Sequence, residues 1–397
     1  MASAPFDVAV VGGGPAGSHA AWRLARAGAR VAVIDGSHPR EKPCGGGVTG
    51  RALALVSQQL DGAGAAPLKG VAIERATFAQ DGVRADVTLP CAGVTPASAI
   101  VIVGRTEFDS QLLERAVRAG VMHARSHAAD VEVTGGRARV RLRDGSDLTA
   151  RWIVGADGAN SLVRRRLFRP FERSELSIAT GYFAHDVVTR SITVEFERDP
   201  AGYLWAFPRP DHLAVGACAQ AHESSPALLR ARAREWIDRQ GLQGRLEPYS
   251  WPIPSLPASA FARQRLAEEG WLLVGDAAGL VDPITREGIF FSLRSAALAA
   301  ESLLEAAAAD RYRERLGDEV LPELRRAAEL KAGFFRPAFT SLLIHALQSS
   351  PPVRTIMADL VAGAQPYRTL VRRLLTTLEV GLAWRVLRLR AARYRTR

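Results

Sequence analysis

Cysteine is scarce in this sequence, and Cys44, Cys91 and Cys218 lie far apart. Without a CxxC pair, neither a structural zinc site nor a disulfide framework is predicted, no metal is expected, and a reducing cytoplasm fits. No run of about 18 or more apolar residues is present, so a transmembrane helix is not expected. A signal peptide is not expected either, because a predicted strand at Phe6–Val11 leads directly into a glycine loop.

Lysine is also scarce, with only three residues, and the positive charge is uneven along the chain. Residues 366–397 hold nine arginines and one acid, which is +8 of the net +11 and leaves +3 on the other 365 residues. Leu, Val and Trp alternate with Arg in this tail at roughly helical spacing. The tail is interpreted as a candidate contact with an anionic membrane surface, or else as a solvated or packing helix. Nucleic-acid binding is disfavoured because no recognised module accompanies the charge.

The 397 residues are 47% hydrophobic and 23% charged, as in a folded globular protein. The segment Gly12-Gly-Gly14-Pro15-Ala16-Gly17 fits GxGxxG between a short apolar strand and a predicted helix over Pro15–Ala27 that Gly28 ends. A second strand follows at Val31–Ile34, and Asp35 stands at its end, where an acid can bind a ribose hydroxyl. This arrangement predicts a dinucleotide site, with the pyrophosphate at the helix N-terminus.

Two later segments resemble each other in form, because each places an aspartate just after a buried strand. Trp152–Gly155 leads to Asp157-Gly158, and Trp271–Gly275 leads to Asp276 and a predicted helix start. A carboxylate in the second position suits ribityl hydroxyls, beside a helix N-terminus that faces a flavin. Thr106 is predicted to cap a helix that runs to Ala119.

With Arg105-Thr-Glu-Phe-Asp109 between them, these motifs resemble the flavoprotein group that includes para-hydroxybenzoate hydroxylase, over roughly residues 6–304. The resemblance implies FAD as cofactor and a further contact of Asp157-Gly158 with a nicotinamide nucleotide. The predicted cofactor-binding residues are Gly12, Gly14, Pro15, Ala16, Gly17, Asp35, Gly45, Gly46, Arg105, Asp157, Gly158, Asp276, Gly279, Pro283, Gly288 and Ile289.

Two more motifs indicate which reaction such a flavoprotein would catalyse. Pro43-Cys44-Gly-Gly-Gly47 lets the backbone approach a planar ligand and offers one reactive side chain, the Cys44 thiol. Tyr203, Trp205 and Phe207 alternate along a predicted strand and would form one flat apolar wall, or simply core. PCGGG together with YxWxFP resembles the geranylgeranyl reductase family, whose members saturate prenyl chains. Many members carry Gly-Glu-Gly where this chain has Arg286-Glu287-Gly288, a departure that could alter substrate reach near the ring.

The predicted architecture is α/β, with a discontinuous Rossmann-like FAD-binding domain (1–70, 96–170 and 268–310). An antiparallel substrate domain (71–95 and 171–267) is inserted, and a helical region with a basic tail (311–397) follows. The resemblance implies an FAD-dependent reductase of isoprenoid C=C bonds, with NADPH or NADH as donor and Cys44 as the acid or polarising group. The alternatives are a flavin monooxygenase or halogenase on an apolar or aromatic substrate, and a non-catalytic flavin-binding protein at a membrane. The expected location is the cytoplasm, with peripheral contact to the inner face of the cell membrane as an option.

Overall fold

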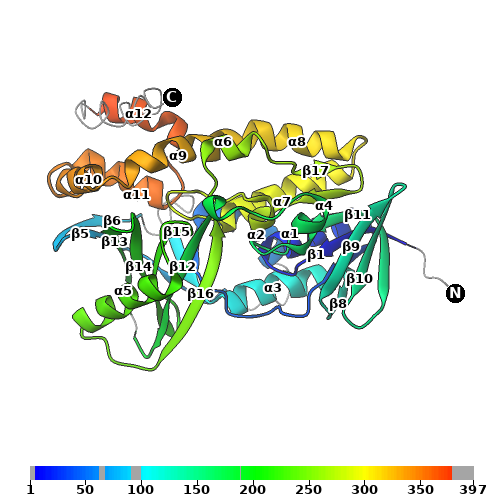
Figure 1. Ribbon diagram of the computed structural model, residues 1–397, viewed down its shortest axis with the longest axis horizontal. Coiled ribbons are helices and arrows are strands. Elements are labelled where there is room, and N and C mark those ends of the chain that lie inside the picture. Colours follow the sequence, from blue (N-terminus) through cyan, green and yellow to red (C-terminus); the bar gives the residue numbers. More distant parts are fainter. Residues whose placement is uncertain (1–4, 62–67, 91–99, 188, 378–397) are drawn as a thin grey trace.

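The structure is a computed structural model and describes residues 5–61, 68–90, 100–187 and 189–377. Its first part is a sheet whose central strands are parallel and buried, in the order β17-β18-β11-β1-β2-β8, with the β9–β10 hairpin added at β11 (Figure 1). The strands are β1 (Phe6–Val11), β2 (Val31–Ile34), β8 (Met122–Ala124), β9 (Ala128–Thr134), β10 (Arg137–Leu142), β11 (Asp147–Gly155), β17 (Ala267–Glu268) and β18 (Trp271–Leu273). Strands β1 and β2 have the predicted bounds, because short β-branched runs between glycine turns are a strong local signal.

Helices cover this sheet and, together with it, form the first half of the molecule. Helix α1 packs against α3 and α7, and α7 packs against α2 and α8. The helices and short helical turns of this half are α1 (Pro15–Arg26), α2 (Gly50–Leu60), α3 (Arg105–Arg118), α4 (Leu162–Leu167), η2 (Arg173–Glu175), α6 (Ala258–Phe261), η3 (Gly275–Ala278) and α7 (Ile289–Leu303).

The second large sheet has the order β16-β12-β15-β14-β13-β5-β6. Its strands are β5 (Arg75–Gln80), β6 (Val83–Thr88), β12 (Leu176–His185), β13 (Ser191–Glu197), β14 (Gly202–Pro208), β15 (His212–Gln220) and β16 (Leu246–Pro254). All neighbours pair antiparallel except β13 and β5, which are parallel. The sheet is therefore antiparallel as expected, apart from one parallel junction where the β5–β6 hairpin arrives from the first half of the chain.

A small third sheet and a helical layer complete the fold. The small sheet pairs β3 (Gly47–Thr49), β7 (Ile100–Val103) and β4 (Gly70–Ala72). Helix α5 (Pro226–Arg239) packs on β12 and β15, whereas α10 and α11 pack on the β5–β6 end (Figure 1). The C-terminal helices are α8 (Ala308–Glu319), α9 (Leu321–Phe334), α10 (Pro337–Ser349), α11 (Pro351–Val361) and α12 (Tyr367–Thr376). The α/β fold with an inserted sheet and a helical C-terminal region is thus confirmed, and the exact domain boundaries remain an interpretation.

Two predicted helix starts were wrong. Helix α3 begins at Arg105 after Gly104, and the Glu41 carboxylate, rather than Thr106, accepts hydrogen bonds from the Arg105 and Thr106 amides at 3.3 and 3.2 Å. The segment after β18 is a 3₁₀ turn, and helix α7 begins only at Ile289, with Gly288 as its N-cap. A helix start depends on which side chain reaches the free amides, and Glu41 reaches them from a distant loop.

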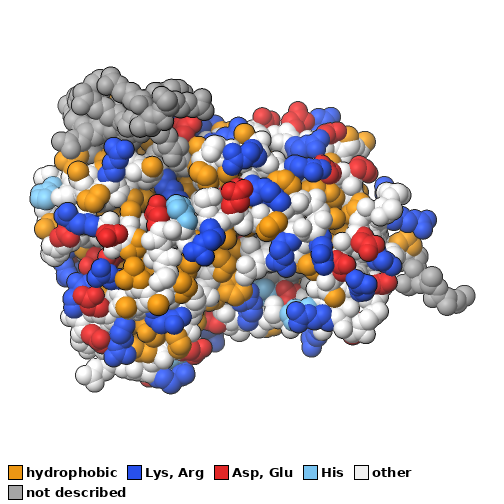
Figure 2. All heavy atoms as spheres, viewed as in Figure 1, with side chains coloured by type: hydrophobic (Ala, Val, Ile, Leu, Met, Phe, Trp, Pro, Cys, Tyr) orange, Lys and Arg blue, Asp and Glu red, His pale blue; other side chains and the backbone are white. Residues whose placement is uncertain are grey.

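The described surface agrees with the small net charge of the chain outside the basic tail. On the face shown in Figure 2, Lys and Arg side chains alternate with Asp and Glu over both halves of the molecule. Within the described residues, no helix is both long enough and apolar enough to span a bilayer. Most of the basic tail, residues 378–397, lies outside the described residues.

Candidate functional site

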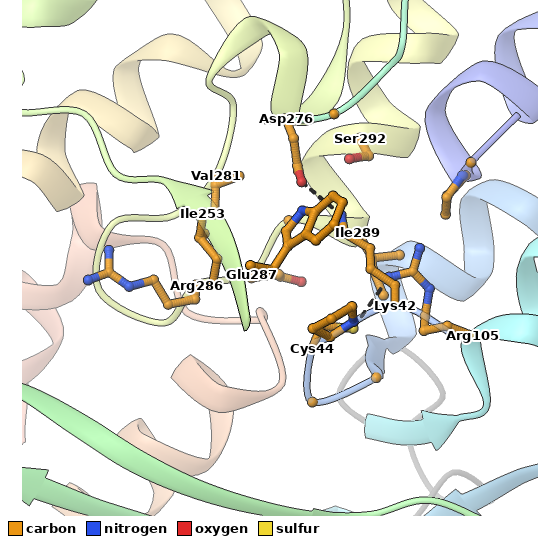
Figure 3. Close-up of a pocket in the computed structure, with 18 of the residues that line it drawn as sticks. Lys42, Cys44, Arg105, Ile253, Asp276, Val281, Arg286, Glu287, Ile289 and Ser292 are labelled. Atoms are coloured by element: carbon orange, nitrogen blue, oxygen red, sulfur yellow. Dashed lines mark hydrogen bonds and ion pairs between the residues drawn. The ribbon is translucent and has the colours of Figure 1, made fainter. Parts of the chain in front are cut away.

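One cavity of about 750 Å³ joins the glycine loop of the first sheet to the inner face of the second sheet. Figure 3 shows its centre, where Asp276, Lys42, Cys44 and Arg105 lie on one side and Arg286 extends away on the other. Of the predicted site residues, all line this cavity except Gly17, Gly279 and Pro283. The sequence motifs therefore converge on one space.

The glycine loop leaves the N-terminus of helix α1 open to the cavity. Gly14 is the N-cap and offers no side-chain cap, so the first amides of the helix have no intrahelical acceptor. Gly12 has φ +107°, and a Cβ there would stand 2.4 Å from the Ala156 carbonyl oxygen. A Cβ on Gly17 would stand 1.9 Å from the Gly12 oxygen, which explains its identity although it does not line the cavity. The loop thus presents amide donors and a positive helix end to an anion.

Asp35 lies at the end of β2, and its carboxylate braces the glycine loop. It accepts hydrogen bonds from the Gly13 amide at 2.6 Å, from the Ser37 amide at 2.6 Å and from His38 Nδ1 at 2.7 Å. Burial opposes ionisation, but the bonds from His38, Gly13 and Ser37 outweigh it and hold the pKa of Asp35 well below its usual range. Asp35 also lines the cavity, so its proposed contact with a ribose hydroxyl remains a prediction.

His38 was not predicted, and it connects Asp35 to the centre of the site. Its Nε2 lies 3.4 Å from Asp109 Oδ2, and Asp109 accepts two bonds from Arg105, at 2.8 and 2.9 Å. Arg105 Nη1 in turn donates to the Cys44 sulfur at 3.3 Å. Burial alone would lower the pKa of His38, but its bonds to Asp109 and Asp35 raise it. A buried polar chain therefore runs from the end of β2 to the thiol.

The Cys44 thiol lies among cations. Burial disfavours its thiolate, yet the charges of Arg105, Arg209 and Lys42 outweigh burial and hold the pKa of Cys44 below its usual range. Arg209 is fully buried and donates to the Cys44 carbonyl at 2.7 Å, to the Val103 carbonyl at 3.0 Å and to Glu41. Sequence reasoning missed Arg209, although it directly follows the YxWxFP motif.

The three aromatic residues share β14 and the cavity as expected, but their wall is not flat, because the Tyr203 and Trp205 ring planes are inclined at 64°. Tyr203, Trp205 and Phe207 all line the cavity, and the rings of Tyr203 and Trp205 are 6.1 Å apart. Two glycines make room for them, because a Cβ on Gly216 would stand 2.3 Å from the Trp205 ring and one on Gly45 would stand 2.4 Å from Phe207. Phe207 therefore packs directly on the PCGGG loop, which places the wall beside Cys44.

The remaining predicted carboxylates have different partners. Asp276 forms an ion pair with Lys42 at 2.9 Å, so the PCGGG loop reaches the segment after β18 (Figure 3). Asp157 accepts hydrogen bonds from Ser161 and from the Leu162 amide and thereby caps α4, while burial raises its pKa. Both residues line the cavity.

The far end of the cavity is apolar and belongs to the C-terminal helices. Phe334, Phe335 and Met357 from α9 and α11 and the loop between α9 and α10 line it, and a second cavity of about 50 Å³ shares Phe334 and Met357 with it. A long hydrocarbon would find apolar contacts there.

Comparisons with known proteins agree with this geometry. The FAD binding domain family matches residues 5–318. A protein named menaquinone reductase from Mycolicibacterium smegmatis is 35% identical over 77% of this chain and 78% of its own length. The chain belongs to the geranylgeranyl reductase family of FAD-dependent oxidoreductases.

The chain is also similar in sequence to other members of this reductase family, and in fold to more distant proteins. A digeranylgeranylglycerophospholipid reductase from Methanopyrus kandleri is 30% identical over 82% of this chain and 89% of its own length. The structure of a geranylgeranyl bacteriochlorophyll reductase-like protein from Thermoplasma acidophilum aligns with a TM-score of 0.76 at 22% identity, covering 94% of this chain and 99% of that one. A flavin-dependent brominase aligns with a TM-score of 0.67 at 19% identity, covering 95% and 100%, which shows a shared fold.

The residues present in this reductase-family chain fit FAD. The uncapped α1 N-terminus offers donors for a pyrophosphate, and Asp35 and Asp276 offer acceptors for hydroxyl groups on either side of it. A Cβ on Gly288, at the start of α7, would stand 3.3 Å from Asp276 Oδ1, so a larger residue there would crowd the Asp276 carboxylate. The lack of a side chain at Gly288 leaves the α7 N-terminus accessible from the same cavity.

Proposed function

We propose that this FAD-dependent oxidoreductase saturates C=C bonds of an isoprenoid chain carried by a quinone, lipid, diphosphate or pigment precursor. The observation that supports this most is the single cavity that continues from the glycine loop past Cys44 to the aromatic and aliphatic far end. The relatives named menaquinone reductase and digeranylgeranylglycerophospholipid reductase make a prenylated quinone and a prenylated lipid the first substrates to test.

When bound, FAD would provide the hydride chemistry for one alkene carbon, with NADPH or NADH as the expected reductant. The other carbon needs a proton, and we assign it to the Cys44 thiol. Arg105 Nη1 at 3.3 Å and Arg209 Nη2 at 3.8 Å from the sulfur would stabilise the thiolate left behind. Tyr203, Trp205 and Phe207 would hold the chain and exclude water, since an isolated alkene gives no charge for the protein to bind.

The proposed cofactor contacts follow the cavity lining. The loop and the α1 N-terminus, at Gly12, Gly14, Pro15, Ala16 and Gly17, would surround the pyrophosphate. Pro15 has no N–H and the Gly12 amide already donates to the Ile34 carbonyl, so the donors would come from the other amides of the first turn of α1. The other proposed contacts are Asp35, Gly45, Gly46, Arg105, Asp157, Gly158, Asp276, Gly279, Pro283, Gly288 and Ile289. For Asp157, the carboxylate already caps α4, so its role would be to fix the turn through Gly158.

The test is product analysis under two atmospheres. Purified FAD-loaded protein is reduced anaerobically and given menaquinone, geranylgeranyl diphosphate or a geranylgeranylated glycerophospholipid, and products are weighed by mass spectrometry. A gain in multiples of two hydrogens supports the reductase and names the carrier. Gain of an oxygen or halogen atom under O₂, without saturation in any anaerobic arm, would instead support the monooxygenase or halogenase alternative.

A further inference from the structure

Arg286 occupies a backbone conformation that favours glycine, and its side chain lines the large cavity. Its φ is +62°, in the left-handed region that residues with a Cβ rarely adopt. The resembled family's Gly-Glu-Gly pattern would meet no such strain at this position. This chain therefore has an arginine with a strained backbone in the wall of its cavity.

Of the three guanidinium nitrogens of Arg286, Nη1 makes hydrogen bonds and the other two make none among the described residues. Arg286 Nη1 donates to the Pro283 carbonyl at 2.6 Å and to Ser255 Oγ. Ser255 is fully buried and also accepts from Lys331 Nζ at 2.7 Å, so Arg286 stands beside a second cation. Among the described residues, Arg286 Nε is buried without a hydrogen-bond partner, Nη2 makes no hydrogen bond, and no carboxylate lies within 4.0 Å of the group.

Arg286 shares the cavity wall with apolar side chains. Ile253, Ile284 and Phe335 line the same cavity, and Arg286 extends away from Cys44 and Arg105, which lie across the site in Figure 3. Arg286 is half-buried, and its unused donors need an oxygen acceptor, from water or from a ligand, because an unpaired donor in a buried wall is unfavourable. A pure hydrocarbon cannot supply that oxygen, whereas the head group of a prenylated molecule can.

We propose that Arg286 binds the acceptor oxygens of the substrate's head group, and so fixes which double bond of the chain lies at Cys44. This inference rests on the proposed function and adds to it a polar anchor opposite the thiol. The acceptor chemistry is shared by a quinone carbonyl and a phosphate oxygen, either of which can accept a hydrogen bond from Nη2. Arg286 would therefore be a specificity-determining residue that contacts substrate at a distance from the reacting carbons.

The experiment compares wild type, Arg286→Gly and Arg286→Lys as FAD-loaded proteins. Dissociation constants are measured from the change in flavin absorbance for menaquinone, for geranylgeranyl diphosphate and for squalene, an isoprenoid hydrocarbon without oxygen. Glycine suits φ +62°, so Arg286→Gly should keep its FAD and melt no lower than wild type. We expect its affinity for an oxygenated ligand to fall about ten- to hundred-fold while squalene binding is unchanged.

The pattern of losses decides the proposal. A loss confined to menaquinone identifies a carbonyl anchor, and a loss confined to the diphosphate, restored in part by Arg286→Lys, identifies a phosphate anchor. Equal losses for all three ligands, or none, would overturn the proposal, since a residue that only braces the loop cannot distinguish a head group from a hydrocarbon. If wild type saturates an isoprenoid and Arg286→Gly does so with the same KM and the same bonds reduced, this inference fails while the proposed function stands. If wild type saturates none of the isoprenoids, the proposed function fails on its own result.

Discussion

At the scale of single residues, Cys44 is the side chain whose role can be separated most cleanly from packing. It is half-buried and small, so Cys44→Ala should leave FAD bound and reducible by the electron donor. Alkene saturation should fall about 10²-fold or more, the usual scale for a lost general acid. Stopped-flow flavin reduction and product analysis on the same sample separate the two half-reactions. Full saturation activity in Cys44→Ala would remove the thiol from the mechanism.

Asp276 and Asp35 should both matter for FAD retention, but with different side effects. Asp276→Ala removes an acceptor beside Lys42, and the apparent FAD affinity should drop about ten- to hundred-fold. Asp35→Ala should cost affinity and also lower the melting temperature of the apoprotein, because this carboxylate holds the Gly13 amide. Titration of apoprotein with FAD and melting without FAD measure the two effects. Unchanged FAD dissociation in both variants would mean that the cofactor lies elsewhere.

His38 should make the stability of the nucleotide-binding half depend on pH. The pKa of His38 is raised above its ordinary value of 6.5 by Asp109 and Asp35, despite the opposing effect of burial. Its charged form therefore stabilises the fold fully below about pH 6.5, and this contribution is lost as pH rises through the higher folded-state value. The melting-temperature gap between wild type and His38→Gln should thus be largest near about pH 6 and shrink towards about pH 9. A gap that is constant over this range would contradict a charged His38.

At the scale of elements, the sequence was most informative where a signal is local. Strands β1 and β2 and the glycine loop were predicted with their correct ends, because burial, β-branching and glycine turns are read within a few residues. The sequence was least informative where a contact joins distant segments, as for Glu41 and Arg209. Glu41 caps a helix that begins 64 residues later, and Arg209 pins a loop 165 residues earlier. Only the folded chain brings these groups together, so the sequence next to Arg209 could mark its position but could not show what Arg209 or Glu41 contacts.

Strand β14 gives a prediction about positioning rather than fold. Trp205→Ala removes a nearly buried ring from the cavity wall, so it should destabilise the protein by about 3–5 kcal/mol and also change which double bonds are reduced. Trp236→Ala on α5 is the matched control, since Trp236 is 5% exposed like Trp205 but lies in a separate core cluster away from the cavity. Thermal melting and product analysis are compared for the pair. The same product pattern in both variants would mean that Trp205 only packs in the core and does not position the substrate.

At the scale of the whole molecule, the structure divides the basic tail into two parts. Helix α12 is integrated into the fold, because Tyr367 and Leu374 are buried and Arg373 forms an ion pair with Asp359 at 2.6 Å. Arg368 lies 3.5 Å from Glu323. Arg368 and Arg373 therefore already pair with acidic side chains of the protein. A membrane role has to come mainly from the residues that follow α12, which hold six arginines and one glutamate.

A truncation after Thr377 is accordingly the right test of membrane attachment, whereas a truncation at Pro366 would also remove the buried side chains of α12. We expect the shorter protein to keep its FAD and its melting temperature, since the truncation leaves α12 in place. Its binding to anionic liposomes should weaken strongly, because attraction is worth about 1 kcal/mol per basic residue near a charged surface. Sedimentation with liposomes at low and high salt measures this, and salt should abolish the difference between the two proteins. If the full-length protein ignores anionic liposomes even at low salt, the arginines after α12 serve another purpose, and the substrate must reach the cavity without electrostatic attachment of the tail to a membrane.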